Sequence, residues 1–195
     1  MKILTPGVVV FVLFLTHFTS FAQPDSAKIS VKAMAFADSL VKSDAYQSWN
    51  AYADLAPLSV LKFYGGKDGY LEHIKTGRQR TVSSIDEDAP QLKLLNLMTA
   101  NDQWQCLIRE SRYFHKDDKK FHQVTYFLGQ SKDEGESWKL FDLSYNKVAN
   151  IIYIFPEVFG DLAIPEPSIL SEQEEIAQQQ AQSAPAAKKS VSKKK

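Results

Sequence analysis

The charged side chains best placed to do chemistry lie on one predicted strand. Glu110 and Arg112 are two residues apart in the segment 103–115, so they share a strand face. The same face carries apolar side chains: Trp104, Cys106, Ile108 and Phe114. In such surroundings the two charges form either a structural ion pair or the polar end of a ligand pocket with shifted pKa values. In the second case Glu110 is a candidate general base.

The histidines offer a second kind of chemistry. His115 and His122 flank a predicted hairpin turn, and pairing residue 116 with 121 would place the two imidazoles opposite each other, where they could hold a metal. No third ligand is obvious, because Asp117 and Asp118 sit in the turn itself, so we assign no metal site. His73, on a predicted helix, is an alternative general base or a surface residue.

Sequence motifs for established enzyme classes are missing. The chain has no Gly-x-Ser-x-Gly elbow, no His-Glu-x-x-His zinc helix and no dinucleotide-binding glycine pattern. Gly65-Gly66 lacks the Gly-Lys-Ser/Thr ending of a phosphate loop and is interpreted as a turn. We therefore assign no catalytic residue and no cofactor, and hydrolase and oxidoreductase classes lose their usual support.

The first 22 residues resemble an export signal. Lys2 supplies a positive start, 8–14 is an apolar run, and 20–22 is a small-x-small cleavage site. An uncleaved membrane anchor is the alternative, although Thr16 and His17 make the apolar run short for a membrane span. The sequence thus predicts an exported protein, periplasmic or extracellular. Cys106 is its only cysteine, which excludes an intramolecular disulfide and favours a buried hydrophobe.

Residues 23–170 have the size of one domain. This body holds 17 basic and 20 acidic residues, a balance that argues against nucleic-acid binding. The tail 171–195 is rich in Gln, Ala and Lys and is predicted to be disordered or a frayed helix. Its lysines either make weak contact with an anionic surface or are only solvated.

Hydrophobic periodicity predicts an α+β fold. A 3.6-residue period indicates helices over 25–44, around 46–53 and over 67–77, while 58–64 reads as a strand or linker. A period of two then predicts antiparallel strands near 91–99, 103–115, 121–131 and 138–141. In 91–99, one face is expected to carry Leu92, Leu94 and Met98 and the other Leu95 and Leu97. The segment 148–155 is either a last strand or the start of a helix.

The segment 131–138 carries the one motif with a recognisable spacing, Ser-x-Asp-x-Gly-x-Ser-Trp. Asp133 can accept hydrogen bonds within its own loop, Gly135 can adopt positive φ, and Trp138 can cover the apolar side of the hairpin. This pattern resembles the Asp-box hairpin of sialidase-type propellers, where it is a structural turn. One copy in one domain cannot build a propeller, so we reject that architecture.

The order of elements, helices followed by a curled antiparallel sheet, resembles the nuclear transport factor 2-like fold, also called the cystatin-like cone. The resemblance covers about residues 25–165 and implies N-terminal helices packed on a curved sheet that encloses a cavity. Some members are isomerases or dehydratases, and many only bind or dimerise. It implies these lining residues: Trp49, Tyr52, Tyr70, Trp104, Ile108, Glu110, Arg112 and Tyr126.

Three functional hypotheses follow. The first is an exported, noncatalytic domain that binds a small apolar or amphipathic ligand or a protein partner, with homodimerisation through the sheet left open. The second is a cone-fold enzyme of isomerase, dehydratase or hydrolase type that uses Glu110 or His73 as a general base. The third is an envelope-associated interaction protein anchored by its lysine tail.

Overall fold

The computed structural model describes residues 26–81, 85–86, 89–146, 148–156 and 162–183. The proposed signal 1–22 and the lysines at the end of the tail lie outside the described residues. Within the described residues, no helix has the length and apolar character needed to cross a bilayer.

Four helices form the N-terminal half: α1 (Ser26–Ala45), α2 (Trp49–Asp54), α3 (Leu58–Phe63) and α4 (Lys67–Thr81). The apolar stripe that the sequence predicts for α1 consists of Ile29, Ala33, Phe36, Ala37 and Leu40. It is confirmed, because four of these residues are buried and Phe36 is partly buried against the core. The strand or linker expected at 58–64 is instead the helix α3, which begins directly after Pro57. Proline is well tolerated at a helix start, and a short apolar run does not distinguish a strand from a buried helix.

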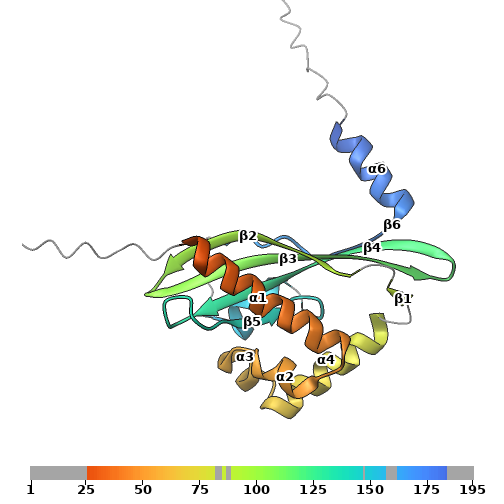
Figure 1. The fold of residues 1–195 in the computed structure, drawn as a ribbon. Coiled ribbons are helices and arrows are strands. Elements are labelled where there is room, and N and C mark those ends of the chain that lie inside the picture. The colour runs from red at the N-terminus through yellow and green to blue at the C-terminus, as the bar shows by residue number, and fades with distance from the viewer. Residues whose placement is uncertain (1–25, 82–84, 87–88, 147, 157–161, 184–195) are drawn as a thin grey trace, which may run out of the picture.

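The other half is a six-stranded antiparallel sheet: β1 (Ile85–Asp86), β2 (Gln91–Ala100), β3 (Gln103–Lys116), β4 (Lys119–Ser131), β5 (Lys139–Asp142) and β6 (Ser168–Ser171). β3 lies between β4 on one side and β2 and β1 on the other, and β4 also pairs with β5 and β6. Helices α1–α4 lie on one side of the sheet (Figure 1). The predicted α+β class, with N-terminal helices packed on a curved antiparallel sheet, is therefore confirmed.

A bulge in β2 changes which leucines face the core. The register with β3 shifts between Leu94 and Asn96, so Leu97 lies opposite Cys106 while Leu95 is exposed. The expectation that Leu95 and Leu97 share a face was therefore wrong, and Met98 does not share one with Leu94. An inserted residue reverses the alternation of a strand beyond it, and a strict period of two cannot anticipate it.

The Asp-box-like turn forms as the sequence predicts. Asp133 accepts hydrogen bonds from the hydroxyl of Ser131 at 2.8 Å and from the backbone N–H of Ser137 at 2.9 Å. Gly135 has a φ of +88°, and the indole of buried Trp138 donates to its carbonyl at 3.2 Å. A Cβ on Gly135 would lie 2.8 Å from Ile29, so the turn sits directly against α1.

The chain after β5 is helical, and its later strand β6 pairs with β4. Val148–Asn150 (η1) and Ile151–Ile154 (α5) settle the alternatives at 148–155 in favour of a helix, and Phe155 packs edge-on against Phe141. Helix α6 (Glu172–Ser183) follows β6 and points away from the body (Figure 1). It occupies the start of the segment expected to be disordered or a frayed helix, and 184–195 lies outside the described residues.

Candidate functional site

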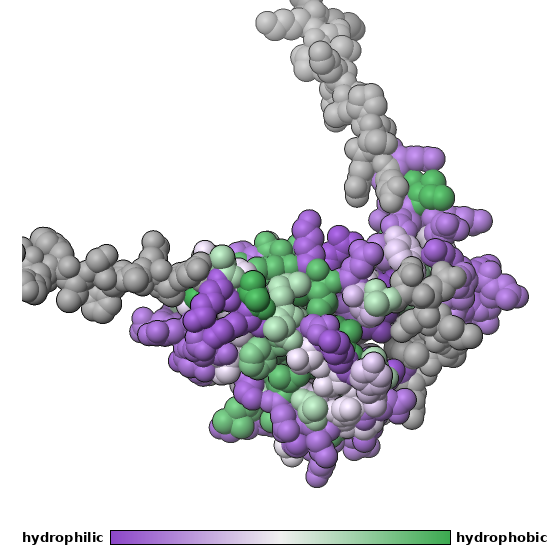
Figure 2. Space-filling model, viewed as in Figure 1, coloured by the Kyte–Doolittle hydropathy of each residue, from purple (hydrophilic) through white to green (hydrophobic). Residues whose placement is uncertain are grey.

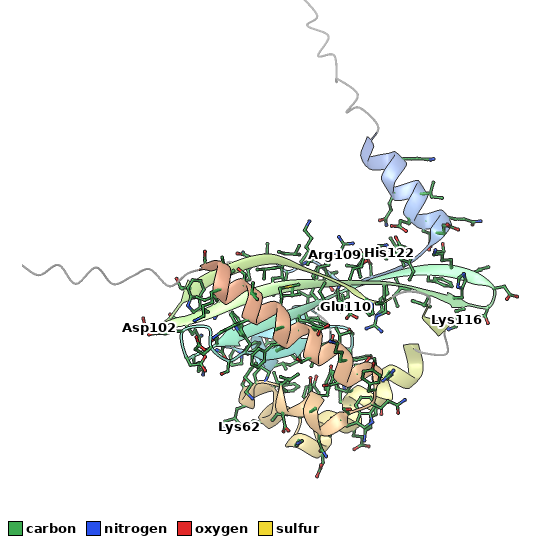
Figure 3. All side chains as sticks on the ribbon, in the orientation of Figure 1. Lys62, Asp102, Arg109, Glu110, Lys116 and His122 are labelled. Atoms are coloured by element: carbon green, nitrogen blue, oxygen red, sulfur yellow. The ribbon has the colours of Figure 1, made fainter. Side chains whose placement is uncertain are left out.

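A buried charge cluster lies on the helix-covered face of the sheet. Strand alternation in β3 aims Glu110 and Arg112 at this face, and the Arg112 guanidinium donates a hydrogen bond to the Glu110 carboxylate. Glu110 is 1% exposed, and Figure 3 shows it on the side of the sheet that the helices cover. The structural ion pair predicted for these two residues is thus present.

A second carboxylate, Asp142, joins the cluster from β5. It accepts a hydrogen bond from the hydroxyl of Tyr52 at 2.9 Å and from the backbone N–H of Ser144 at 2.7 Å. The Ser144 hydroxyl also donates to it, at 2.5 Å. All three donors stabilise the ionised form of a carboxylate that is otherwise buried.

Burial dominates the electrostatics of the cluster. It raises the pKa of Glu110 to about 7, although Arg112 acts in the opposite direction. It also raises the pKa of Asp142, against the hydrogen bonds from Ser144 and Tyr52. Burial likewise holds the Tyr52 and Tyr70 hydroxyls protonated by raising each pKa well above its usual range.

An aromatic layer from the helices covers these charges. Tyr52 of α2 and Tyr70 of α4 stack at 6.2 Å, and Tyr64 packs on Tyr70 at 5.5 Å. His73 stacks on Tyr64 at 4.5 Å and shares a hydrogen bond with its hydroxyl at 3.3 Å. His73, the alternative general base, therefore belongs to the aromatic layer rather than pairing directly with Glu110.

Six of the eight expected lining residues belong to this region, and two do not. Trp49 contacts Tyr52 edge-on at 6.4 Å, and Ile108 is fully buried on the same face as Glu110. Trp104 lies at the far end of β3, opposite Ser131, six residues from Glu110 and so roughly 20 Å away along the strand. Tyr126 lies opposite Arg109, which places it on the other face of the sheet.

The opposed histidine pair does not form. Only Asp117 and Asp118 make the turn, both with positive φ, so His115 pairs with Lys120 and His122 with Tyr113. Aspartate tolerates this left-handed conformation, which explains why the turn is tighter than the one assumed. Among the described residues, no group of three His, Cys, Asp or Glu side chains could hold a metal ion.

Cys106 lies on the same face of β3 as Glu110. The prediction that it is a buried hydrophobic residue is confirmed. It is fully buried, and burial raises the pKa of its thiol to about 12. A thiol with so high a pKa is a poor nucleophile at neutral pH.

Sequence reasoning missed Asp142 and Tyr145 as members of this region. Burial raises the pKa of the Tyr145 hydroxyl, and the nearby Asp142 adds to the effect. Asp142 did carry a signal, because it stands between Phe141 and Leu143 at an inward position of an apolar strand. A carboxylate that is buried in such a position needs hydrogen-bond donors or a positively charged partner to offset its desolvation.

Among the residues that the structure describes, three surface hollows stand out, all outside the cluster. The first, about 440 Å³, lies between the β3–β4 turn and the start of α6. The second, about 540 Å³, is at the β2–β3 turn beside the Asp-box loop, and Trp104 lines it. The third, about 290 Å³, lies along α4. Glu110 lines none of the three.

The fold and the cluster define an α+β protein with a helix-covered antiparallel sheet and a buried ion pair beneath the helices. No protein-family model, no curated protein and no solved structure matches the chain.

Proposed function

We propose that this protein is an exported binding domain of the cone type, and that it recognises an apolar or amphipathic protein partner on its outer surface. The observation that carries this proposal is the burial of the charge cluster beneath the helices. Glu110 is paired with Arg112, and Glu110, Tyr52 and Tyr70 are almost completely buried. A small ligand would have to displace the aromatic layer, whereas an outer surface needs no rearrangement.

Exposed apolar side chains on two contacting helices support a protein partner. On α3, Leu58 is 65% and Phe63 53% exposed, and on α5, Ile152 is 66% and Tyr153 70% exposed. Figure 2 shows hydrophobic surface over α3, with more of it along α1 and β2. Grouped exposed apolar residues are typical of interaction surfaces. We call these four residues the α3–α5 patch.

The cone-fold enzyme is the second candidate, favoured by the raised pKa of Glu110. A carboxylate with a pKa of about 7 is suited to proton transfer near neutral pH. Against it, Glu110 is almost completely buried and already bonded to Arg112. Resemblance to the nuclear transport factor 2-like fold supports both candidates, because that fold includes enzymes and binding proteins.

The test compares partner retention by the full chain and by surface variants. The double variant Leu58→Ser/Phe63→Ser removes half of the α3–α5 patch, and Leu95→Ser removes an exposed leucine of β2 as a matched control. We expect one protein from the host to co-purify stoichiometrically with the wild type and with Leu95→Ser but not with the double variant.

Native mass spectrometry of the same preparations separates the alternatives. A small molecule retained by the wild type and by the double variant alike would overturn the outer-surface proposal and favour a ligand inside the cone. Loss of the partner from Leu95→Ser as well would show that binding does not depend on the α3–α5 patch.

A further inference from the structure

Hydrogen bonds link three polar side chains on the sheet face opposite helices α1–α4. The Ser111 hydroxyl of β3 lies 2.7 Å from Nε2 of His122 on β4, and Nδ1 of the same imidazole lies 2.9 Å from Oε1 of Glu175 on α6. The three residues come from separate elements, and Glu175 is 53 residues from His122. Figure 3 shows His122 and Arg109 together on this face, away from Glu110.

The order of the atoms fixes the direction of the hydrogen bonds. An ionised carboxylate only accepts, so Nδ1 of His122 carries the proton that it donates to Glu175. In the neutral imidazole, Nε2 is then an acceptor, and the Ser111 hydroxyl donates to it. A hydroxyl, an imidazole and a carboxylate in this order are the arrangement that activates a serine nucleophile on several unrelated folds.

The imidazole is held in place by its surroundings. Tyr113 stacks on His122 at 4.4 Å with an interplanar angle of 14°, and the His122 side chain is 10% exposed. The Glu174 carboxylate accepts hydrogen bonds from the backbone N–H of Ser171 at 2.8 Å and its hydroxyl at 2.7 Å, which caps the start of α6. This cap fixes the turn of helix that presents Glu175.

Positive charge lies on the same sheet face as the Ser111 hydroxyl. Arg109 shares the strand and the face of Ser111, and its buried Nε has no hydrogen-bond partner among the described residues. Lys93 lies opposite Arg109 on β2 and is exposed. A cation near a reacting carbonyl stabilises the negative charge that develops on its oxygen.

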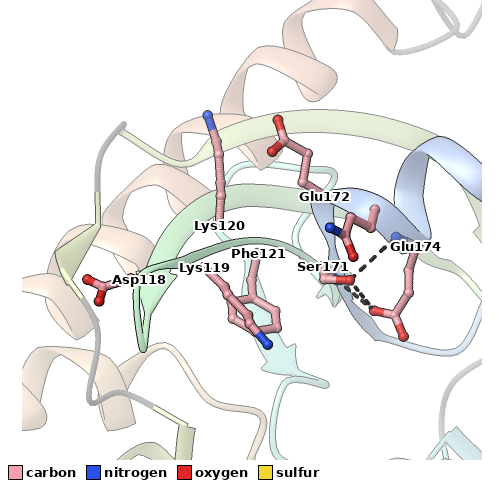
Figure 4. Close-up of a pocket in the computed structure, with 8 residues that line it drawn as sticks. Asp118, Lys119, Lys120, Phe121, Ser171, Glu172 and Glu174 are labelled. Carbon is pink, nitrogen blue, oxygen red and sulfur yellow. Dashed lines mark hydrogen bonds between the residues drawn. The ribbon is translucent and has the colours of Figure 1, made fainter.

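A hollow lies near His122 and Glu175, because their neighbours Phe121 and Glu174 line it, although none of Ser111, His122 and Glu175 does. It is the 440 Å³ space between the β3–β4 turn and the first turn of α6 (Figure 4). Lys120 lines it and lies two residues before His122 on the same face of β4. Ser111 itself is partly exposed.

We propose that Ser111, His122 and Glu175 form a second functional site, which hydrolyses small carboxylic esters. The Ser111 oxygen attacks the ester carbonyl carbon while His122 Nε2 takes the hydroxyl proton. The carbon–oxygen bond to the alcohol then breaks, and His122 returns the proton to the departing alkoxide. Water, deprotonated by His122, cleaves the acyl-serine to release the acid and restore Ser111. Glu175 acts as a positioning residue.

The experiment uses the full chain and a fluorophosphonate probe, in which the serine oxygen displaces fluoride from phosphorus. We expect one adduct per chain, located on Ser111 by peptide mapping, absent from Ser111→Ala and retained by the matched control Ser39→Ala on the exposed side of α1. His122→Gln should slow labelling by about 100-fold or more. With p-nitrophenyl acetate, Glu175→Gln should lower kcat at unchanged KM.

Peptide mapping of the wild-type adduct keeps the proposal testable if a variant fails to fold. An unlabelled wild type, or an adduct on another serine, would overturn the proposal and leave these contacts as an attachment of α6 to the sheet. Equal labelling rates in wild type and His122→Gln would also overturn it. The binding role proposed for the α3–α5 patch is unaffected by either outcome.

Discussion

Replacing the buried Glu110 with glutamine should stabilise the protein at neutral and alkaline pH but not in mild acid. Glutamine has the shape of the protonated carboxyl and cannot ionise. The pKa of Glu110 is about 7 in the folded chain against an ordinary value of 4.5. The folded state therefore holds the proton more tightly, and the free energy of unfolding falls as pH rises between those two values.

The magnitude follows from the two pKa values. Their separation corresponds to a loss of about 3 kcal/mol in the wild type once pH exceeds the folded value. Glu110→Gln avoids this loss, because its side chain matches the protonated form at every pH. The variant should therefore equal the wild type near about pH 4 and exceed it by about 3 kcal/mol near about pH 8.

Urea unfolding of both proteins at several pH values measures the difference. Glu72→Gln, at an exposed position of α4, is the matched control and should show no comparable trend. A stability difference between Glu110→Gln and wild type that stays constant over this pH range would refute the reasoning. A variant less stable than wild type at alkaline pH would show that the ion pair with Arg112 outweighs desolvation.

Two further substitutions test the packing of the last hairpin. Asp133→Ala removes the acceptor of three hydrogen bonds from Ser131 and Ser137 and should lower stability by about 1 to 3 kcal/mol, measured by urea unfolding; a loss below about 0.5 kcal/mol would contradict the structural role of the turn. Gly129→Ala places a Cβ 2.4 Å from the Cys106 sulfur and should cost about 1 to 3 kcal/mol by the same assay. Adding Cys106→Ala, which is itself destabilising, should reduce the cost of Gly129→Ala, and strictly additive effects would exclude the clash as its cause.

The elements that were predictable are those whose pattern repeats. The buried stripe of α1 repeats from Ile29 to Leu40, and the Asp-box turn is specified by side chains within the segment 131–138. Helix α3 was missed because it has only six residues, and the four apolar ones among them fit either period. The bulge at Leu95 carried no periodic signal of its own.

The sites were harder to predict because they depend on the register of the strands. Glu110 and Arg112 were found because they are neighbours on one strand, whereas Asp142 reaches their face only through the pairing of β4 with β5. Glu175 was assigned to the tail, and only the pairing of β6 with β4, which places the first turn of α6 beside β4, brings it to His122. The hairpin turn is two residues shorter than expected, so His115 lies opposite Lys120 and not opposite His122.

The packing of the Asp-box loop against α1 has a consequence for biosynthesis. Ile29 packs against Gly135, and Lys32 pairs with Glu136 across 104 residues of sequence. Helix α1 thus leaves the ribosome long before the loop against which it packs, and contacts between such distant segments form slowly. A chain interrupted before Gly135 is left with the apolar stripe of α1 only partly covered, which makes prematurely terminated products targets for proteolysis and aggregation.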